Sequence, residues 1–195
     1  VNGNKMNSPQ TLILEIRKYA AEAPVTLEYE RAGAKRKVVI PLGVRKDPAA
    51  LIGRAAPAFN LPAYPGAEKW TVKPGKIYIV DFWATWCGPC EPVRRALEDF
   101  QRGDKSGRIE IVGITTEDNE TIKAFYGGKK PPYTIVVDAS NEVTTSFHVQ
   151  GYPTIAVIDT KGVVRFAGFA SGGGFETAIE LARKLAAETL ASAPS

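Results

Sequence analysis

The segment Asp81-Phe82-Trp83-Ala84-Thr85-Trp86-Cys87-Gly88-Pro89-Cys90 contains both cysteines of this chain, Cys87 and Cys90. It follows an apolar run, residues 77–80, that is typical of a buried strand. The Gly-Pro pair between the cysteines indicates a turn, and proline suits the first turn of a helix. The sequence therefore predicts that the two sulfur atoms lie where a strand gives way to a helix.

A cysteine at the start of a helix has a lowered thiol pKa. Unpaired backbone N–H groups and the positive end of the helix dipole favour the thiolate there. The thiolate is the species that attacks disulfides, and a second thiol one turn away can displace the first from a mixed disulfide. We therefore expect Cys87, the first and more exposed cysteine, to be the nucleophile, and Cys90 to be the resolving thiol.

A static structural disulfide and half of a zinc site are the alternative interpretations. Zinc takes about four nitrogen or sulfur ligands in a structural site. The chain offers two cysteines and one histidine, which argues against a metal site.

Residues 80–90 resemble the active-site segment of the thioredoxin superfamily, with only position 85 outside the shared pattern. The resemblance implies a thioredoxin fold and thiol–disulfide exchange that needs no bound cofactor. Gly88-Pro89 is also the dipeptide of thioredoxin itself, which implies a reducing couple. Glu91 stands where a basic residue is common, and a carboxylate beside the cysteines disfavours the thiolate.

Composition excludes several other classes of function. The 195 residues suit one or two domains with a sizeable core, and the net charge of +4 is spread over interspersed basic and acidic residues. Nucleic-acid binding would need basic residues gathered with stacking aromatic residues, and no such cluster is visible. No run approaches the roughly 18 apolar residues of a transmembrane helix, and no secretory signal is visible. Val1 is not a natural initiator residue, so the removal of a leader or of a longer N-terminal part stays open, as does a membrane anchor outside this chain.

Residues 1–46 differ from the rest of the chain. A helical pattern begins at Ser8-Pro9, and apolar stretches at 25–30 and 38–40 flank a turn at Gly33, which predicts a helix followed by a hairpin. The segment resembles the C-terminal half of a PDZ domain, which implies part of a peptide-binding module; an unrelated α/β appendage is the alternative. Half a domain has an exposed sheet edge, so we expect it to pack on the rest of the chain or on another chain.

The remainder of the chain is expected to comprise a linker, residues 47–57, and a thioredoxin-like domain, residues 58–191. The run from Ala56 to Pro62 resembles the opening of the TlpA-like thiol–disulfide oxidoreductases, an extracytoplasmic group. That resemblance implies a periplasmic or otherwise extracytoplasmic location.

Alternating strand and helix patterns in this part predict an α/β fold with a mixed central sheet flanked by helices. We expect strands at 77–83, 109–114, 133–138, 153–158 and 163–169. We expect helices after Cys90, at 118–126, at 141–149 and from about residue 175. The helix–strand pair at 118–138 matches the insertion that distinguishes the TlpA-like group from plain thioredoxin.

Asp81 is an acidic residue in an otherwise apolar strand, so burial should raise its pKa. It matches the acid that lies behind the second cysteine in thioredoxins. The resemblance implies that Asp81 is a general base for Cys90. A solvated acid at a strand edge is the alternative.

Gly151-Tyr152-Pro153-Thr154 resembles the cis-proline loop of the superfamily. The resemblance implies that this loop faces the cysteines, and that the backbone at Tyr152 pairs with an extended substrate segment. The exposed rim of the site should include Trp86. The expected substrate-binding residues are Trp86, Gly88, Pro89, Tyr152, Pro153 and Thr154.

The sequence as a whole predicts a thiol–disulfide oxidoreductase that reduces protein disulfides through Cys87 and Cys90. Its partners would be a disulfide-containing protein substrate and an upstream protein that restores the dithiol. Two alternatives stay open: a disulfide oxidase or isomerase, and a PDZ-type peptide-binding module in which the cysteines are secondary.

Overall fold

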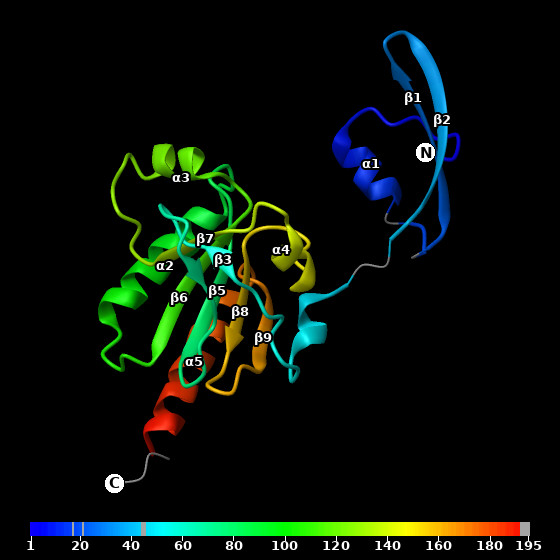
Figure 1. The fold of residues 1–195 in the computed structure, drawn as a ribbon. Coiled ribbons are helices and arrows are strands. Elements are labelled where there is room, and N and C mark those ends of the chain that lie inside the picture. Colours follow the sequence, from blue (N-terminus) through cyan, green and yellow to red (C-terminus); the bar gives the residue numbers. More distant parts are fainter. Residues whose placement is uncertain (17, 21, 44–45, 192–195) are drawn as a thin grey trace. The chain divides into compact units, whose positions relative to one another are not determined.

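The structure is a computed structural model that describes residues 1–195 apart from 17, 21, 44–45 and 192–195. The chain divides into two compact units, Val1–Lys46 and Asp47–Ser195. Figure 1 labels the helices and strands of each unit along the chain. In the part of the chain that is described, no helix has both the length and the apolar character that a membrane crossing requires.

The first unit contains helix α1 (Pro9–Ile16) and an antiparallel hairpin of strands β1 (Pro24–Arg31) and β2 (Ala34–Pro41). The hairpin turns at Ala32 and Gly33, whose φ angles are 53° and 75°. Two consecutive residues with positive φ are what the tight turns of two-residue hairpins require. The predicted helix followed by a hairpin is confirmed.

The second unit is built on a five-stranded sheet in the order β7-β6-β5-β8-β9. Strands β5, β6 and β7 are parallel, whereas β8 is antiparallel to β5 and β9 is antiparallel to β8. This confirms the predicted α/β class with a mixed central sheet. The bounds are β5 (Ile77–Phe82), β6 (Ile109–Thr115), β7 (Thr134–Val137), β8 (Thr154–Ile158) and β9 (Val164–Phe169).

Central strand β5 serves two core layers, because successive side chains point to opposite faces of a sheet. Ile77 and Ile79 pack in one layer with helices α2 (Cys90–Gly103) and α5 (Gly174–Ala191). Tyr78 and Val80 pack in the other layer with helix α4 (Glu142–Ser146). Helix α3 (Asn119–Phe125) and β7 occupy the predicted insertion. Figure 1 shows these helices around the sheet.

Residues 47–57 are part of the second unit rather than a free linker. Pro48–Leu51 form a short 3-10 helix, η1, with the Asp47 side chain accepting the N–H of Ala49. The N–H of Gly53 then donates to the carbonyl of Val164 at 2.8 Å. The second unit therefore begins at Asp47, and all of residues 47–57 belong to it.

Two short strands that the sequence did not predict cover one edge of the sheet. β3 (Leu61–Pro62) pairs with β4 (Lys69–Trp70). The N–H of Tyr64, in the connection between them, donates to the carbonyl of Ile135 on edge strand β7 at 2.9 Å. This pairing partly covers an edge that would otherwise present free backbone groups.

Candidate active site

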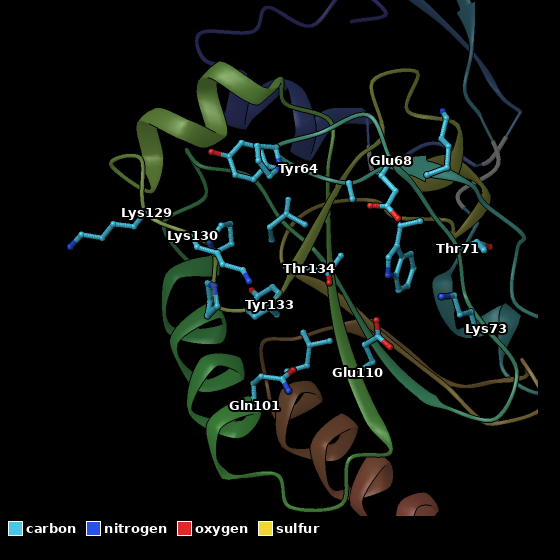
Figure 2. A pocket seen from close by; sticks show the side chains of 18 of the residues that line it. Tyr64, Glu68, Thr71, Lys73, Gln101, Glu110, Lys129, Lys130, Tyr133 and Thr134 are labelled. Atoms are coloured by element: carbon cyan, nitrogen blue, oxygen red, sulfur yellow. The ribbon is translucent and has the colours of Figure 1, made fainter.

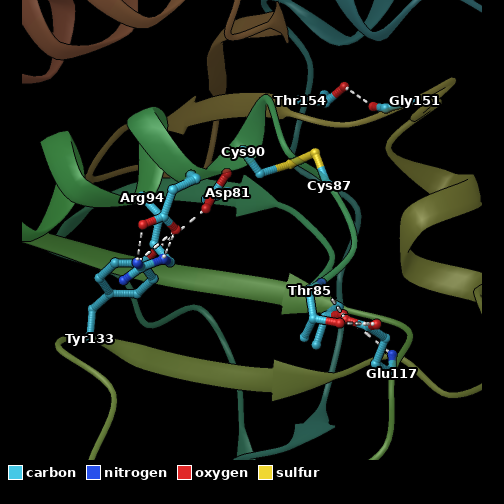
Figure 3. Close-up of a disulfide and its surroundings, with 11 residues drawn as sticks. Asp81, Thr85, Cys87, Cys90, Arg94, Glu117, Tyr133, Gly151 and Thr154 are labelled. Atoms are coloured by element: carbon cyan, nitrogen blue, oxygen red, sulfur yellow. Dashed lines mark hydrogen bonds and ion pairs between the residues drawn. A yellow bond between two sulfur atoms is a disulfide. The ribbon is translucent and has the colours of Figure 1, made fainter. Parts of the chain in front are cut away.

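The two cysteines lie at the junction between β5 and α2, as predicted. Cys87 belongs to the loop of residues 83–89, which we call the cysteine loop, and Cys90 is the first residue of α2. They form a disulfide with an S–S distance of 2.03 Å (Figure 3). Pro89, at the N-cap position, makes no side-chain hydrogen bond to the first turn. Because Cys90 is the first residue of α2, the positive end of the helix dipole is directed at the sulfur pair.

Both cysteines are largely covered, and Cys87 is the more exposed by a small margin: 7% of its surface is accessible, against 4% for Cys90. Both line a hollow of about 260 Å³ together with Trp83, Gly88 and Arg94, among others. This hollow gives another molecule an approach to the disulfide.

The loop before β8 lies beside the cysteine loop. The Tyr152–Pro153 peptide bond is cis, as the motif predicted. Thr154 pairs with Phe82 at the end of β5, which sets the loop next to the start of the cysteine loop. The hydroxyl of Thr154 donates to the carbonyl of Gly151 at 2.7 Å, and Figure 3 shows this bond near the disulfide.

An aromatic contact joins the two loops. The ring centroids of Trp86 and Tyr152 are 5.8 Å apart. Trp86 is 74% exposed, so the expected apolar rim is present at the surface. The structure thus brings together the residues that the sequence predicted for substrate binding: Trp86, Gly88, Pro89, Tyr152, Pro153 and Thr154.

Asp81 is buried, with 1% of its surface accessible, so it is not a solvated acid at a strand edge. The hydroxyl of Tyr133 donates to its Oδ2 at 3.3 Å, and no hydrogen-bond partner reaches Oδ1 among the described residues. Burial raises the pKa of Asp81 from 3.8 to about 7, although the Tyr133 hydrogen bond and the charge of Arg94 lower it. A carboxyl group with this pKa can exchange a proton near neutral pH.

Arg94 connects the helix side of the site. It forms ion pairs with Glu91 and Glu98, one turn to either side on α2, and lies over the ring of Phe125. Hydrogen bonds from Arg94 and Arg95 lower the pKa of Glu91. Glu91 is therefore ionised but neutralised by these arginines, which weakens the expected effect of its charge on the cysteines.

The sequence analysis missed Glu117, which holds the cysteine loop. The backbone N–H and the hydroxyl of Thr85 each donate to the Glu117 carboxylate at 2.7 Å (Figure 3). The usable signal was position: Thr85 follows β5 and Glu117 follows β6, and the carboxyl ends of parallel strands meet at one edge of a sheet.

A larger hollow of about 820 Å³ lies elsewhere on this unit, and neither cysteine lines it. Its wall combines lysine and glutamate side chains with Tyr64 and Tyr133, as Figure 2 shows. In the part of the chain that the structure describes, no group of three or more His, Cys, Asp or Glu residues could hold a metal ion.

Comparisons with known proteins agree with this geometry. The model of the Redoxin family matches residues 51–173. The thiol:disulfide interchange protein HelX of Rhodobacter capsulatus is 34% identical over 128 residues, 62% of this chain and 70% of that protein. The thioredoxin-like protein YneN of Bacillus subtilis is 31% identical over 118 residues, 58% of this chain and 68% of that protein.

Among solved structures, a putative thiol:disulfide interchange protein DsbE from Chlorobium tepidum superposes with a TM-score of 0.59 at 27% identity. The superposed region covers 67% of this chain and 96% of the Chlorobium tepidum chain. The Redoxin match begins at residue 51 and gives no support to the PDZ resemblance of residues 1–46.

Proposed function

Since this chain belongs to the Redoxin family and is a TlpA-like thiol–disulfide oxidoreductase of the thioredoxin superfamily, we propose that it reduces disulfides of other proteins. The observation that carries the proposal is the Cys87–Cys90 disulfide, which lies at the N-terminus of α2, lines a hollow, and belongs to a loop that contacts the cis-proline loop through Trp86 and Tyr152. A helix N-terminus stabilises the thiolate that the reduced form needs.

The reaction consists of two exchanges. The Cys87 thiolate attacks one sulfur of a substrate disulfide, and the other substrate sulfur leaves as a thiolate. Cys90 then loses its proton to Asp81, and its sulfur attacks the Cys87 sulfur of the mixed disulfide. The second substrate sulfur leaves, and the enzyme holds the Cys87–Cys90 disulfide.

Two electrons have then passed from the enzyme dithiol to the substrate. An upstream dithiol protein must supply two electrons to restore Cys87 and Cys90. The proposed partners are therefore a disulfide-containing protein and a reducing protein.

Substrate binding is assigned to the rim around the disulfide. Trp86 and Tyr152 offer an exposed aromatic surface, and the backbone beside a cis-proline is suited to pairing with an extended segment. The assigned residues are Trp86, Gly88, Pro89, Tyr152, Pro153 and Thr154.

The direction of electron flow is tested by equilibrating the protein with glutathione mixtures and measuring the Cys87–Cys90 potential. Gly88-Pro89 is the thioredoxin dipeptide, so we expect a potential near thioredoxin's, about −270 mV. A value between about −180 and −120 mV, in the range of isomerases and oxidases, would reject the reductase and favour the alternative direction.

We further propose an extracytoplasmic location, on the resemblance of residues 56–62 to the opening of the TlpA-like group. A fusion of the protein, expressed from its own gene, to alkaline phosphatase, which is active only outside the cytoplasm, tests this. An inactive fusion that is expressed at normal levels would contradict it.

A further inference from the structure

The floor of the site contains a space that a single glycine leaves open. Asp81 on β5 pairs with Gly113 on β6. A Cβ atom at Gly113 would lie 2.8 Å from Nε1 of Trp83, 2.8 Å from Cδ1 of Ile135 and 3.2 Å from Cε2 of Tyr133. These side chains thus occupy the volume that any larger residue at position 113 would need.

The Tyr133 ring uses this space to reach the carboxylate. Tyr133 precedes β7 and is 52 residues from Asp81 in sequence, yet its hydroxyl lies 3.3 Å from Asp81 Oδ2. Tyr133 is buried. Burial and the adjacent Asp81 charge raise the pKa of Tyr133 well above its ordinary range, so its hydroxyl remains a donor wherever Asp81 titrates.

We propose that Tyr133 is a positioning residue for the thiol exchange: its hydroxyl holds Oδ2 of Asp81, and Oδ1 is left to accept the Cys90 proton. Oδ1 is buried and has no hydrogen-bond partner among the described residues. Asp81 lies beneath the disulfide on the Cys90 side in Figure 3, with Tyr133 beyond it. The inference rests on the proposed role of Asp81 as the base for Cys90.

The proton has a defined route in each direction. As Cys90 attacks the mixed disulfide, its S–H bond breaks and an O–H bond forms at Asp81. When the upstream partner reduces the Cys87–Cys90 disulfide, the departing Cys90 sulfur takes that proton back. Tyr133 keeps its own proton throughout and supplies a hydrogen bond that favours the carboxylate form of Asp81.

Other groups near Asp81 act less directly. Arg94, on α2, lowers the pKa of Asp81 through its charge, but it is shared between Glu91 and Glu98. Tyr126, just after α3, senses the Asp81 charge, yet its hydroxyl has no hydrogen-bond partner among the described residues. Tyr133 is thus the direct hydrogen-bond donor to Asp81, and Tyr126 is a matched control.

The test compares Tyr133→Phe with Tyr126→Phe, each of which removes one buried hydroxyl and keeps the ring. The Asp81 pKa is measured by titrating the ¹³C signal of its carboxyl carbon. A hydrogen bond to a charged group is worth enough to shift the pKa by about one unit or more. We expect Tyr133→Phe to raise the pKa by that amount and Tyr126→Phe to leave it within about a quarter of a unit.

The resolving step gives a second readout. Reduced protein reacting with dithiobis(nitrobenzoate) releases one thionitrobenzoate when Cys87 attacks and a second when Cys90 resolves the mixed disulfide. At a pH about one unit below the wild-type Asp81 pKa, we expect Tyr133→Phe to slow the second release about tenfold. At a pH well above both pKa values the two proteins should react equally fast.

An unchanged Asp81 pKa in folded Tyr133→Phe, or an equal shift in Tyr126→Phe, would overturn the inference. Asp81→Asn separates this from the proposed function. If Asp81→Asn resolves the mixed disulfide as fast as wild type, the general-base role fails, even where Tyr133→Phe shifts the Asp81 pKa. In the Asp81→Asn background, Tyr133→Phe should cause no further change in the pH profile; an independent slowing there would contradict positioning through Asp81.

Discussion

The indole of Trp86 and the phenol of Tyr152 contact each other across the active site, with ring centroids 5.8 Å apart and planes inclined by 52°. Trp86 belongs to the cysteine loop and Tyr152 to the cis-proline loop. Their contact therefore ties the loop that performs the exchange to the loop assigned to the substrate backbone.

Truncating this rim should affect large substrates more than small ones. Aromatic contacts contribute about 0.5–1.5 kcal/mol beyond the area that they bury, so we expect Trp86→Ala to lower kcat/KM for a protein disulfide about tenfold. The rate with dithiobis(nitrobenzoate), which needs little surface, should change by less than about twofold. Ile52→Ala, at an exposed apolar residue outside both loops, is the control. If the rate fell equally with both substrates, Trp86 would affect the reactivity of the Cys87–Cys90 pair rather than the binding of a protein substrate.

Burial of Asp81 should make stability depend on pH. The unfolded chain ionises this carboxyl near its ordinary pKa of 3.8 and the folded protein near about 7. At a pH below both values the carboxyl is neutral in both states, so burial of its charge costs nothing. Between the two values ionisation favours the unfolded chain, and the loss of folding stability reaches its full size above about pH 7. At about 1.36 kcal/mol per unit this amounts to roughly 4 kcal/mol.

We therefore expect Asp81→Asn to stabilise the oxidised protein at about pH 8 by up to roughly 4 kcal/mol, and hardly at all near pH 4. Urea unfolding of both proteins between about pH 4 and pH 8 measures this difference in the free energy of unfolding. Asp159 is a contrasting control: burial raises its pKa, but hydrogen bonds from Val163 and Arg165 outweigh this and lower it overall. Asp159→Asn should destabilise the protein at neutral pH. If Asp81→Asn raised the free energy of unfolding equally at every pH, ionisation of the Asp81 carboxyl would not be the cause of the gain.

Removing the Glu117 carboxylate should loosen the cysteine loop. In Glu117→Ala, the backbone N–H and the hydroxyl of Thr85 each lose the carboxylate oxygen to which they donate, and each unsatisfied group costs about 1–3 kcal/mol where it stays buried. We expect lower stability by about 1–3 kcal/mol and faster amide hydrogen exchange in residues 83–89. Glu120→Ala, at an exposed residue of α3, should change neither. Unaltered exchange in the loop would rule out Glu117 as its anchor.

Adding a single methyl group at position 113 should disturb the floor of the site. The new Cβ would lie 2.8 Å from side-chain atoms of Trp83 and Ile135, and overpacking of this kind costs about 1–3 kcal/mol. We expect Gly113→Ala to lower the free energy of unfolding by that amount. Gly103→Ala places its Cβ in open space at the end of α2 and should be neutral or slightly stabilising. If both variants have wild-type stability, the space around position 113 is not tightly filled.

Local patterns were sufficient to predict much of this protein. The apolar run before Asp81, the turn at Gly88-Pro89 and the motif around Pro153 are contiguous in sequence, and each fixes its own piece of backbone. The hydrogen bonds from Tyr133 to Asp81 and from Thr85 to Glu117 span 52 and 32 residues. Such pairs depend on strand order and register, which no local pattern specifies.

Packing also overrode two local interpretations. Residues 47–57 look like a linker in sequence, but their backbone pairs with the strand around Val164. The strands β3 and β4 have two residues each, which is too short to show a periodic pattern. Trp70 of β4 stacks on Phe59, with the ring centroids 5.7 Å apart. In both cases the partner that stabilises the segment lies elsewhere in the chain.

The most direct test of the central claim is to trap the first exchange. Cys90→Ser cannot resolve a mixed disulfide, so incubation of the reduced variant with insulin should accumulate a covalent adduct that mass spectrometry maps to Cys87. Under the same conditions Cys87→Ser should form little or none. An adduct that forms through Cys90 as fast as through Cys87, or no adduct from Cys90→Ser while the wild-type protein reduces insulin, would contradict the account.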